Sequence, residues 1–146
     1  MKFYRLMKYS LAAFLLALVF ALPGKAQQNN LTPEQKEKQM YEQIDKEVER
    51  LTTLLKLDEA QQFYVTMSLT ECLKGLQEEL ASLSASGVQN ADIYITIQDK
   101  WLEKLDNDYK SYFTPDQWKR YLRSGAERAQ KARAKRREKA ESVTEN

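Results

Sequence analysis

The longest regular pattern of apolar residues lies between Leu57 and Leu83. Large apolar residues recur there every three or four positions, which places them on one face of an α-helix. They are Val65, Leu69, Leu73, Leu76, Leu80 and Leu83, and we expect Phe63, Tyr64 and Met67 to widen this face near its start. Gly75 interrupts the helix at a cost of about 1 kcal/mol relative to Ala. A stripe of this length must be covered by other helices, so the pattern predicts a helical bundle.

Apolar residues with helical spacing also occur before and after this segment. The preceding helix, expected to end near Lys56, has Met40, Ile44, Val48, Leu51 and Leu55 on one face. In the following segment, Ile93, Ile95 and Ile97 alternate as they would in a β-strand. Helical spacing nevertheless runs through Ile97, Trp101, Leu105, Tyr109 and Tyr112. We interpret the segment as a helix, because a lone short strand would have no partner.

Three helix starts share one local pattern. Segments 31–35, 57–61 and 113–117 each contain an apolar residue, then Thr or Asp, then Gln three positions later. In a capping box, the Thr or Asp side chain accepts from the backbone of the third helical residue, whose own side chain accepts from the cap. The pattern predicts this role for Thr32, Gln35, Asp58, Gln61, Thr114 and Gln117. We expect the second helix to stop at 84–87, where Gly87 suits a left-handed turn.

The chain after Gly125 differs from the rest because it contains no large apolar residue before Val143. Its alanines, lysines and arginines have high helix propensity. We therefore predict a helical domain over residues 31–125 and a basic helical tail over 126–146, partly disordered at its end. The predicted fold is all-α, a four-helix hairpin or bundle.

The N-terminus has the pattern of a cleaved secretory signal peptide over residues 1–26. Lys2, Arg5 and Lys8 precede a twelve-residue apolar run, Leu11–Leu22, and small residues precede Gln27. The run is too short to cross a bilayer about 30 Å thick as a helix, which disfavours the alternative of a membrane anchor. We expect a periplasmic or secreted protein, with a disordered linker at 27–30.

Charge is distributed unevenly along the chain. Residues 27–118 contain 9 basic and 17 acidic residues, a formal charge of −8, whereas residues 119–139 contain 10 basic and 2 acidic residues, a charge of +8. Such asymmetry bears on partners and association rather than on fold. It predicts an acidic body with a basic tail.

The residues needed for common catalytic and metal sites are scarce. The chain has one Cys and no His, which argues against a zinc or copper site and against Ser-His or Cys-His catalysis. Cys72 is expected to be a buried, inert thiol, with an intersubunit disulfide as the alternative. The carboxylate pairs Asp45/Glu49 and Asp99/Glu103 have helical spacing, and we interpret them as solvated acidic faces rather than acid–base or metal sites. We expect no enzyme activity and no cofactor.

Two groups of residues are candidates for binding other molecules. Aromatic residues near the junction of the third and fourth helices either pack in the core or form an exposed groove for protein segments. They are Trp101, Tyr109, Tyr112, Phe113, Trp118 and Tyr121. The basic tail is either a solvated helix end or an arm that attracts acidic clients, lipopolysaccharide or membrane headgroups. Its candidate anion-binding residues are Arg128, Lys131, Arg133, Lys135, Arg136, Arg137 and Lys139. Nucleic acid is not expected, because the tail lacks aromatic residues for base stacking.

With its signal-like N-terminus, helical pattern and helix starts, the chain resembles the Spy/CpxP family of small periplasmic proteins. The closest matches to that family's LTxxQ motif are Leu31-Thr32-Pro33-Glu34-Gln35 and Phe113-Thr114-Pro115-Asp116-Gln117. The chain departs from the family in having Asp58 in the middle copy and in gathering its basic residues in the tail. The resemblance implies a helical hairpin that dimerises into a curved cradle.

The resemblance also implies a function without turnover. Family members act as ATP-independent chaperones for unfolded envelope proteins, or bind a sensor kinase and restrain it. We therefore expect a protein-binding, envelope-stress type of protein. The alternatives are a signalling adaptor for one sensor or envelope partner, and a structural protein whose tail binds anionic envelope surfaces.

Overall fold

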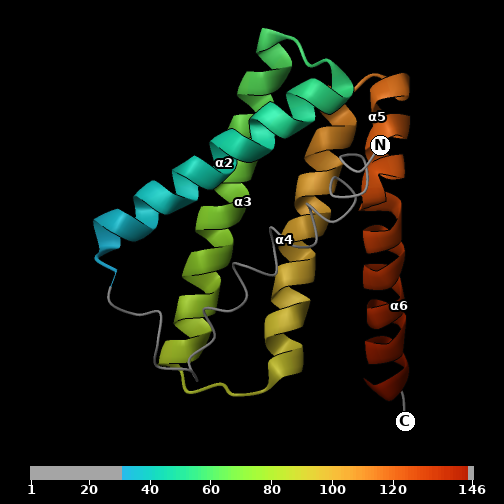
Figure 1. The fold of residues 1–146 in the computed structure, drawn as a ribbon. Helices are drawn as coiled ribbons and strands as arrows, with labels where there is room; N and C mark the ends of the chain where they lie inside the picture. The colour runs from blue at the N-terminus through green and yellow to red at the C-terminus, as the bar shows by residue number, and fades with distance from the viewer. Residues whose placement is uncertain (1–30, 145–146) are drawn as a thin grey trace, which may run out of the picture. The chain divides into compact units, whose positions relative to one another are not determined.

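The computed structural model of the chain describes residues 31–144, and all its regular elements in that range are helical (Figure 1). They are α2 (Pro33–Leu55), α3 (Glu59–Ala85), α4 (Ala91–Tyr112), α5 (Pro115–Tyr121), the π-helical turn η2 (Leu122–Ala126) and α6 (Glu127–Thr144). With α5 to α6 counted as one kinked helix, the prediction of an all-α, four-helix fold is confirmed. Residues 93–97 belong to α4, which rules out the strand alternative there. The predicted signal peptide (1–26) and linker (27–30) lie outside the described residues.

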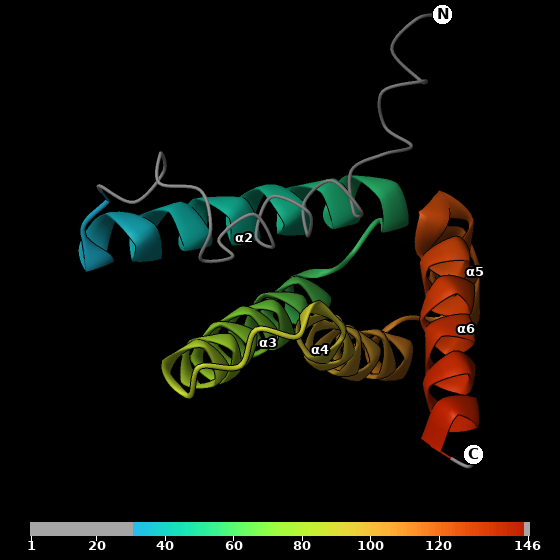
Figure 2. The ribbon, with the colours of Figure 1, turned by 90° about the horizontal axis from the view of Figure 1, so that it is seen from below.

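The chain divides into two compact units near the middle of α5. We call the part up to Trp118 the α2–α4 unit, and the part from Lys119 onward the C-terminal unit. In the α2–α4 unit, α3 and α4 run antiparallel as a hairpin, and α2 crosses them as a second layer (Figures 1 and 2). The predicted boundary at residue 125 falls inside η2, where Gly125 has a φ of 118°. That backbone conformation strains any residue with a side chain, so glycine sets the kink before α6.

The apolar face predicted for α3 is buried over most of its length. Val65, Leu69, Leu73 and Leu76 are buried, with Ser68 and Cys72 beside them. Leu80 and Leu83, nearer the hairpin loop, are only half-buried. The helix ends as expected, with Gly87 at a φ of 74° and its backbone N–H donating to Ser84. The stripe therefore forms a core that thins toward the loop.

The face predicted for α2 is correct except at one position. Met40, Ile44, Leu51 and Leu55 are buried, but Glu47 is buried where Val48 was expected. Arg50 makes this possible, because its Nε and Nη2 atoms donate to the two carboxylate oxygens of Glu47 at 2.8 and 2.7 Å. A carboxylate so paired has its charge and hydrogen-bond capacity largely satisfied, which lowers the cost of burying it.

Candidate protein-binding surface

All three predicted helix starts form capping boxes. Thr32 and Gln35 exchange backbone and side-chain hydrogen bonds at 2.9 and 3.2 Å, and Asp58 and Gln61 do so at 3.2 and 2.8 Å. Thr114 and Gln117 make the same pair of bonds at 2.9 and 3.3 Å. The prediction that these six residues initiate helices is therefore confirmed in local geometry.

Two of the three glutamines also bind each other across the α2–α4 unit. The Gln61 Nε2 donates to the Gln117 Oε1 at 2.7 Å, and the Gln117 Nε2 donates to the Gln61 Oε1 at 3.0 Å. Each amide also donates to the end of a helix: Gln61 to the carbonyl of Tyr112 at 2.9 Å, and Gln117 to the carbonyl of Leu55 at 3.2 Å. We call this pair the glutamine clasp. It joins the turn between α2 and α3 to the turn between α4 and α5.

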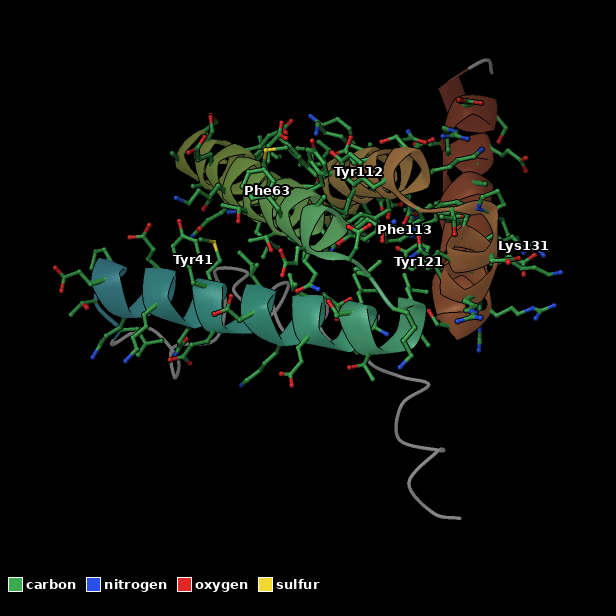
Figure 3. All side chains as sticks on the ribbon, turned by 90° about the horizontal axis from the view of Figure 1, so that it is seen from above. Tyr41, Phe63, Tyr112, Phe113, Tyr121 and Lys131 are labelled. Atoms are coloured by element: carbon green, nitrogen blue, oxygen red, sulfur yellow. The ribbon has the colours of Figure 1, made fainter. Side chains whose placement is uncertain are left out.

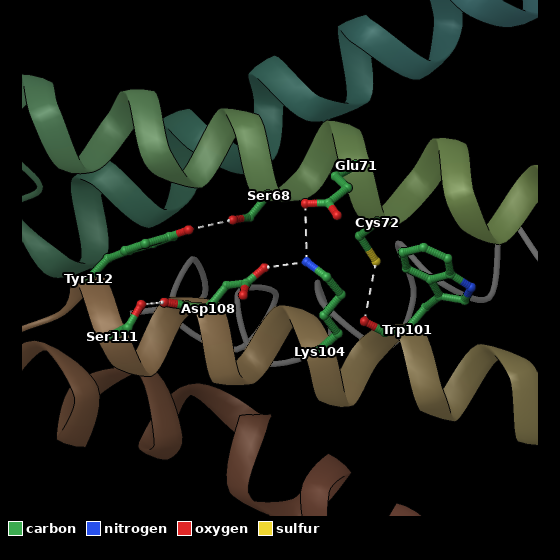
Figure 4. Close-up of polar contacts among 8 residues, drawn as sticks. All are labelled: Ser68, Glu71, Cys72, Trp101, Lys104, Asp108, Ser111 and Tyr112. Carbon is green, nitrogen blue, oxygen red and sulfur yellow. Dashed lines mark hydrogen bonds and ion pairs between the residues drawn. The ribbon is translucent and has the colours of Figure 1, made fainter.

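Tyr112 extends the clasp onto the surface of the hairpin. Its carbonyl accepts from Gln61, and its hydroxyl lies 3.0 Å from the Ser68 hydroxyl of α3 (Figure 4). Its ring stacks on Tyr64 with centroids 5.1 Å apart. One backbone contact and two side-chain contacts therefore fix Tyr112, and its ring contact holds Tyr64 in place.

Beside this fixed pair lies a group of exposed apolar side chains on the outer side of α3. Phe63 is 64% exposed, Tyr64 44% and Met67 47%. Phe63 packs edge-on against Tyr64, with ring centroids 5.7 Å apart, and Figure 3 shows Phe63 on α3 and Tyr112 on α4. We call Phe63, Tyr64, Met67 and the neighbouring ring of Tyr112 the α3 patch. Nothing in the α2–α4 unit covers Phe63 or Met67 to the extent of burying them.

The expectation that Phe63, Tyr64 and Met67 widen the buried face of α3 is therefore wrong. At about 100° per residue, Phe63 lies two positions, or about 200°, from Val65, and Met67 lies as far from Leu69. These side chains must point away from the core whenever the stripe points into it. A helical wheel that includes Phe63, Met67 and the buried residues Val65 and Leu69 predicts this exposed position from the sequence.

Half of the predicted aromatic cluster is buried. Tyr109, Phe113 and Tyr121 are 1%, 7% and 1% exposed, so the core alternative holds for these three and the exposed-groove alternative is wrong. Trp101, Tyr112 and Trp118 are half-buried. Large apolar rings stabilise most when fully removed from water, which is the physical reason for the correction. Of the six, Tyr112 alone belongs to the α3 patch.

Close packing fixes α3 against α4 at Gly75. A Cβ atom at this position would lie 2.1 Å from the indole ring of Trp101, so the glycine makes room for the ring. The indole Nε1 donates to the Glu79 Oε2 at 2.7 Å, and Lys100 donates to both oxygens of Glu79 at 2.7 Å. The hydrogen bonds from Lys100 and Trp101 lower the pKa of Glu79. Packing against Trp101 therefore explains why glycine occupies this position despite its unfavourable helix propensity.

Polar contacts continue along the hairpin between Gly75 and the clasp (Figure 4). Lys104 of α4 donates to the Glu71 Oε2 of α3 at 3.1 Å and to the Asp108 Oδ2 at 3.0 Å. Cys72 is buried, with its Sγ 3.5 Å from the carbonyl oxygen of Trp101, and burial raises its pKa to about 12. The expectation of a buried thiol is confirmed, and a sulfur in this position cannot reach another subunit without opening the hairpin.

The carboxylate pairs show no converging chemistry. Asp45 and Glu49 line a shallow hollow of about 260 Å³ between α2 and α3, together with Val48, Thr52, Thr53 and Gln62. Asp99 and Glu103 lie on α4. Among residues 31–144, no three His, Cys, Asp or Glu side chains come together as a metal site would require. The ring of Tyr109 is 1% exposed, and burial, followed by the charge of Glu47, raises the pKa of its hydroxyl.

All seven basic residues of the predicted tail lie on α6. Arg133 is half-buried and the other six are exposed. Lys131 pairs with Glu127 at 2.8 Å, an ion pair that lowers the pKa of Glu127. No helix in the described part of the chain is both long and apolar enough to span a membrane.

Comparisons of the chain with protein-family models, with curated proteins and with solved structures found no match. The Spy/CpxP resemblance therefore rests on the short motifs alone. The local geometry of those motifs and the exposed α3 patch are the observations on which a function can be argued.

Proposed function

We propose that the protein binds apolar segments of other polypeptides through the α3 patch, without chemical turnover, as an ATP-independent chaperone of the Spy/CpxP type. The observation that carries the proposal is the exposure of Phe63, at 64%, beside Tyr64 and Met67 on a hairpin fixed by the glutamine clasp. Exposed apolar groups that adjoin one another mark interaction sites more often than single exposed residues do. The proposal includes export through residues 1–26.

The chemistry of the patch favours aromatic and aliphatic segments as clients. Two aromatic rings and a methionine offer adaptable apolar contacts, since the thioether chain can follow irregular shapes. Another exposed aromatic residue, Tyr41 of α2 (labelled in Figure 3), is already engaged, because the Lys74 Nζ lies 5.3 Å from its ring centre. The formal charge of −8 over residues 27–118 favours clients whose apolar segments are flanked by basic residues.

Suppression of aggregation by surface variants tests the proposal. The double variant Phe63→Ser/Met67→Ser removes the patch, and Ile93→Ser/Ile95→Ser removes two exposed residues, each 39% exposed, from the other end of the hairpin. A chemically denatured test protein is diluted into each variant without ATP, and light scattering is followed. We expect the patch variant to need at least tenfold more protein for equal suppression, whereas the control variant matches the parent.

Two results would overturn the proposal. The first is the absence of protection by the parent chain at several-fold molar excess. The second is an equal loss of protection in both variants while they keep the parent's melting temperature. Affinity capture from the cell envelope separates a chaperone from an adaptor. A spectrum of captured proteins supports the proposal, and one dominant partner lost on Phe63→Ser/Met67→Ser supports the adaptor instead.

A further inference from the structure

One side of α6 carries a line of exposed positive charges. Arg128, Lys131, Lys135 and Lys139 recur at spacings of three, four and four, so they share one face of the helix over about 16 Å. All four are exposed. The half-buried residues of this stretch lie on the opposite face and are Ala129, Gln130, Arg133 and Ala134. We call the four basic residues the cationic stripe, and Figure 3 shows Lys131 projecting from α6.

The stripe has charge but no means of apolar recognition. From Glu127 to Ser142, α6 contains no aromatic residue and no apolar residue larger than Ala. It therefore cannot stack on nucleic-acid bases, insert into hydrocarbon, or fill a pocket on a protein partner. A partner of this face must be recognised by negative charge alone.

We infer that the cationic stripe binds the phosphate-bearing surface of an anionic lipid bilayer. Three of its four residues are lysines, whose compact charges on flexible stems suit many phosphates at once rather than one fixed bidentate site. Ala132 and Ser142 lie on the same side and are too small to hold the four basic side chains away from a flat surface. The ion pair of Lys131 with Glu127 is exposed at both residues and can exchange partners.

The α2–α4 unit does not provide this attraction. Residues 27–118 carry a formal charge of −8, which an anionic surface repels. Each basic residue near an anionic bilayer strengthens binding about fivefold, so four acting together strengthen it several hundredfold. The inference is independent of client binding, because none of the four residues belongs to the α3 patch.

Vesicle binding by the full chain tests the inference. Binding to vesicles of phosphatidylcholine with about one-third phosphatidylglycerol is compared with binding to vesicles of pure phosphatidylcholine. The uncharged vesicles measure any binding through the apolar run Leu11–Leu22. One variant replaces the stripe with glutamines at Arg128, Lys131, Lys135 and Lys139. The matched control removes the same number of charges from exposed sites of the α2–α4 unit, at Lys36, Lys38, Lys46 and Lys110. Circular dichroism verifies that both variants keep their helix content.

We expect the affinity of the stripe variant for the phosphatidylglycerol vesicles to be at least a hundredfold lower than that of the parent. The affinity of the control variant should stay within about fivefold of the parent. Raising the salt concentration should abolish the binding that depends on phosphatidylglycerol. Equal losses in both variants, or equal binding of the parent to the two lipid compositions, would overturn the inference. Tighter binding to single-stranded DNA than to vesicles at equal phosphate concentration would also overturn it, in favour of a polymeric partner.

Discussion

At one end of the α3–α4 hairpin, the glutamine clasp connects residues 51 to 62 positions apart in the sequence. At the other end, the loop between α3 and α4 is held by bonds between near neighbours, such as that from the Tyr94 hydroxyl to the Val88 carbonyl at 2.7 Å. Along the core-facing stripe of α3, Val65 near the clasp is 0% exposed, whereas Leu80 and Leu83 near the loop are half-buried.

The difference between the clasp end and the loop end shows that apolar spacing and helix capping do not by themselves decide which end of a helix pair is more rigid. Both ends belong to the same two helices, but long-range hydrogen bonds and a covering layer from α2 are concentrated at one of them. Local stability within a domain follows burial and such contacts, so the clasped end should open least often. Beside the clasp, contacts hold Tyr64 and Tyr112 of the α3 patch in place, which reduces the entropy that these two rings lose when a client binds.

The largest effect is expected from breaking the clasp. Gln61→Ala removes its bonds to Gln117 and to the Tyr112 carbonyl and leaves part-buried polar groups without partners, so the free energy of unfolding should fall by about 3 kcal/mol. Gln35→Ala, which breaks only an exposed capping box, should cost about 0.5 kcal/mol. Urea denaturation measures both. Equal losses of unfolding free energy in the two variants would show that Gln61 stabilises the fold only by capping its helix.

The middle of the hairpin can be probed through Cys72. Its pKa is raised from 9.0 to about 12 in the folded chain, so between these values the unfolded state loses the proton while the folded state keeps it. Stability is therefore complete below pH 9 and falls as the pH rises, by up to about 1.4 kcal/mol per pH unit. From pH 9 to 11, the parent should lose about 2.3 kcal/mol more than Cys72→Ala does, because half of the unfolded thiols are already deprotonated at pH 9. If the free energies of unfolding of the parent and of Cys72→Ala fell in parallel as the pH rises, the assignment of Cys72 as a buried thiol would be contradicted.

Gly75→Ala tests whether the close packing extends beyond Cys72 toward the loop. The new methyl group would collide with Trp101 and displace the indole from Glu79. Overpacking should cost about 2 kcal/mol, of which about 1 kcal/mol is returned by helix propensity, so a net loss of about 1 kcal/mol is expected. Trp101 fluorescence should shift to the red as the ring becomes wetter. An increase in stability without a spectral change would place the indole elsewhere.

The smallest effect is expected at the loop. Tyr94→Phe deletes one hydrogen bond, to Val88, at a site where the half-buried carbonyl can turn to water. The free energy of unfolding should fall by about 0.5 kcal/mol. Hydrogen exchange of the α4 amides nearest the loop should accelerate, while amides near Tyr109 keep their protection. Faster hydrogen exchange both near the loop and near Tyr109 would show that the two ends of the hairpin do not differ in local stability.

Local patterns in the sequence predicted the helices and their starts, because a capping box and a three-to-four spacing are decided by residues a few positions apart. They also predicted the left-handed Gly87 and the buried Cys72. They did not predict that Gln61 and Gln117 meet, since Gln35 has the same local pattern and makes no such bond. Nor did they predict the buried Glu47, which depends on Arg50 and on the layer that covers it.

The candidate surface was harder to predict than the fold. Aromatic residues around Tyr109 and Phe113 formed the denser cluster in the sequence, but density of large rings is equally typical of a core. Spacing along the sequence alone groups Phe63 and Met67 with the buried face of α3, whereas their direction around the helix places them on the opposite side. The identity of a client or partner depends on a second molecule, which no pattern in this chain contains.

Site-specific cross-linking tests the central claim most directly. A photo-reactive amino acid replaces Phe63 in one variant and Ile95 in another, and each is illuminated with the same denatured client. We predict at least tenfold more client cross-linked at position 63 than at position 95. Equal yields at the two positions, or a higher yield at position 95, would contradict the assignment of the α3 patch as the binding surface.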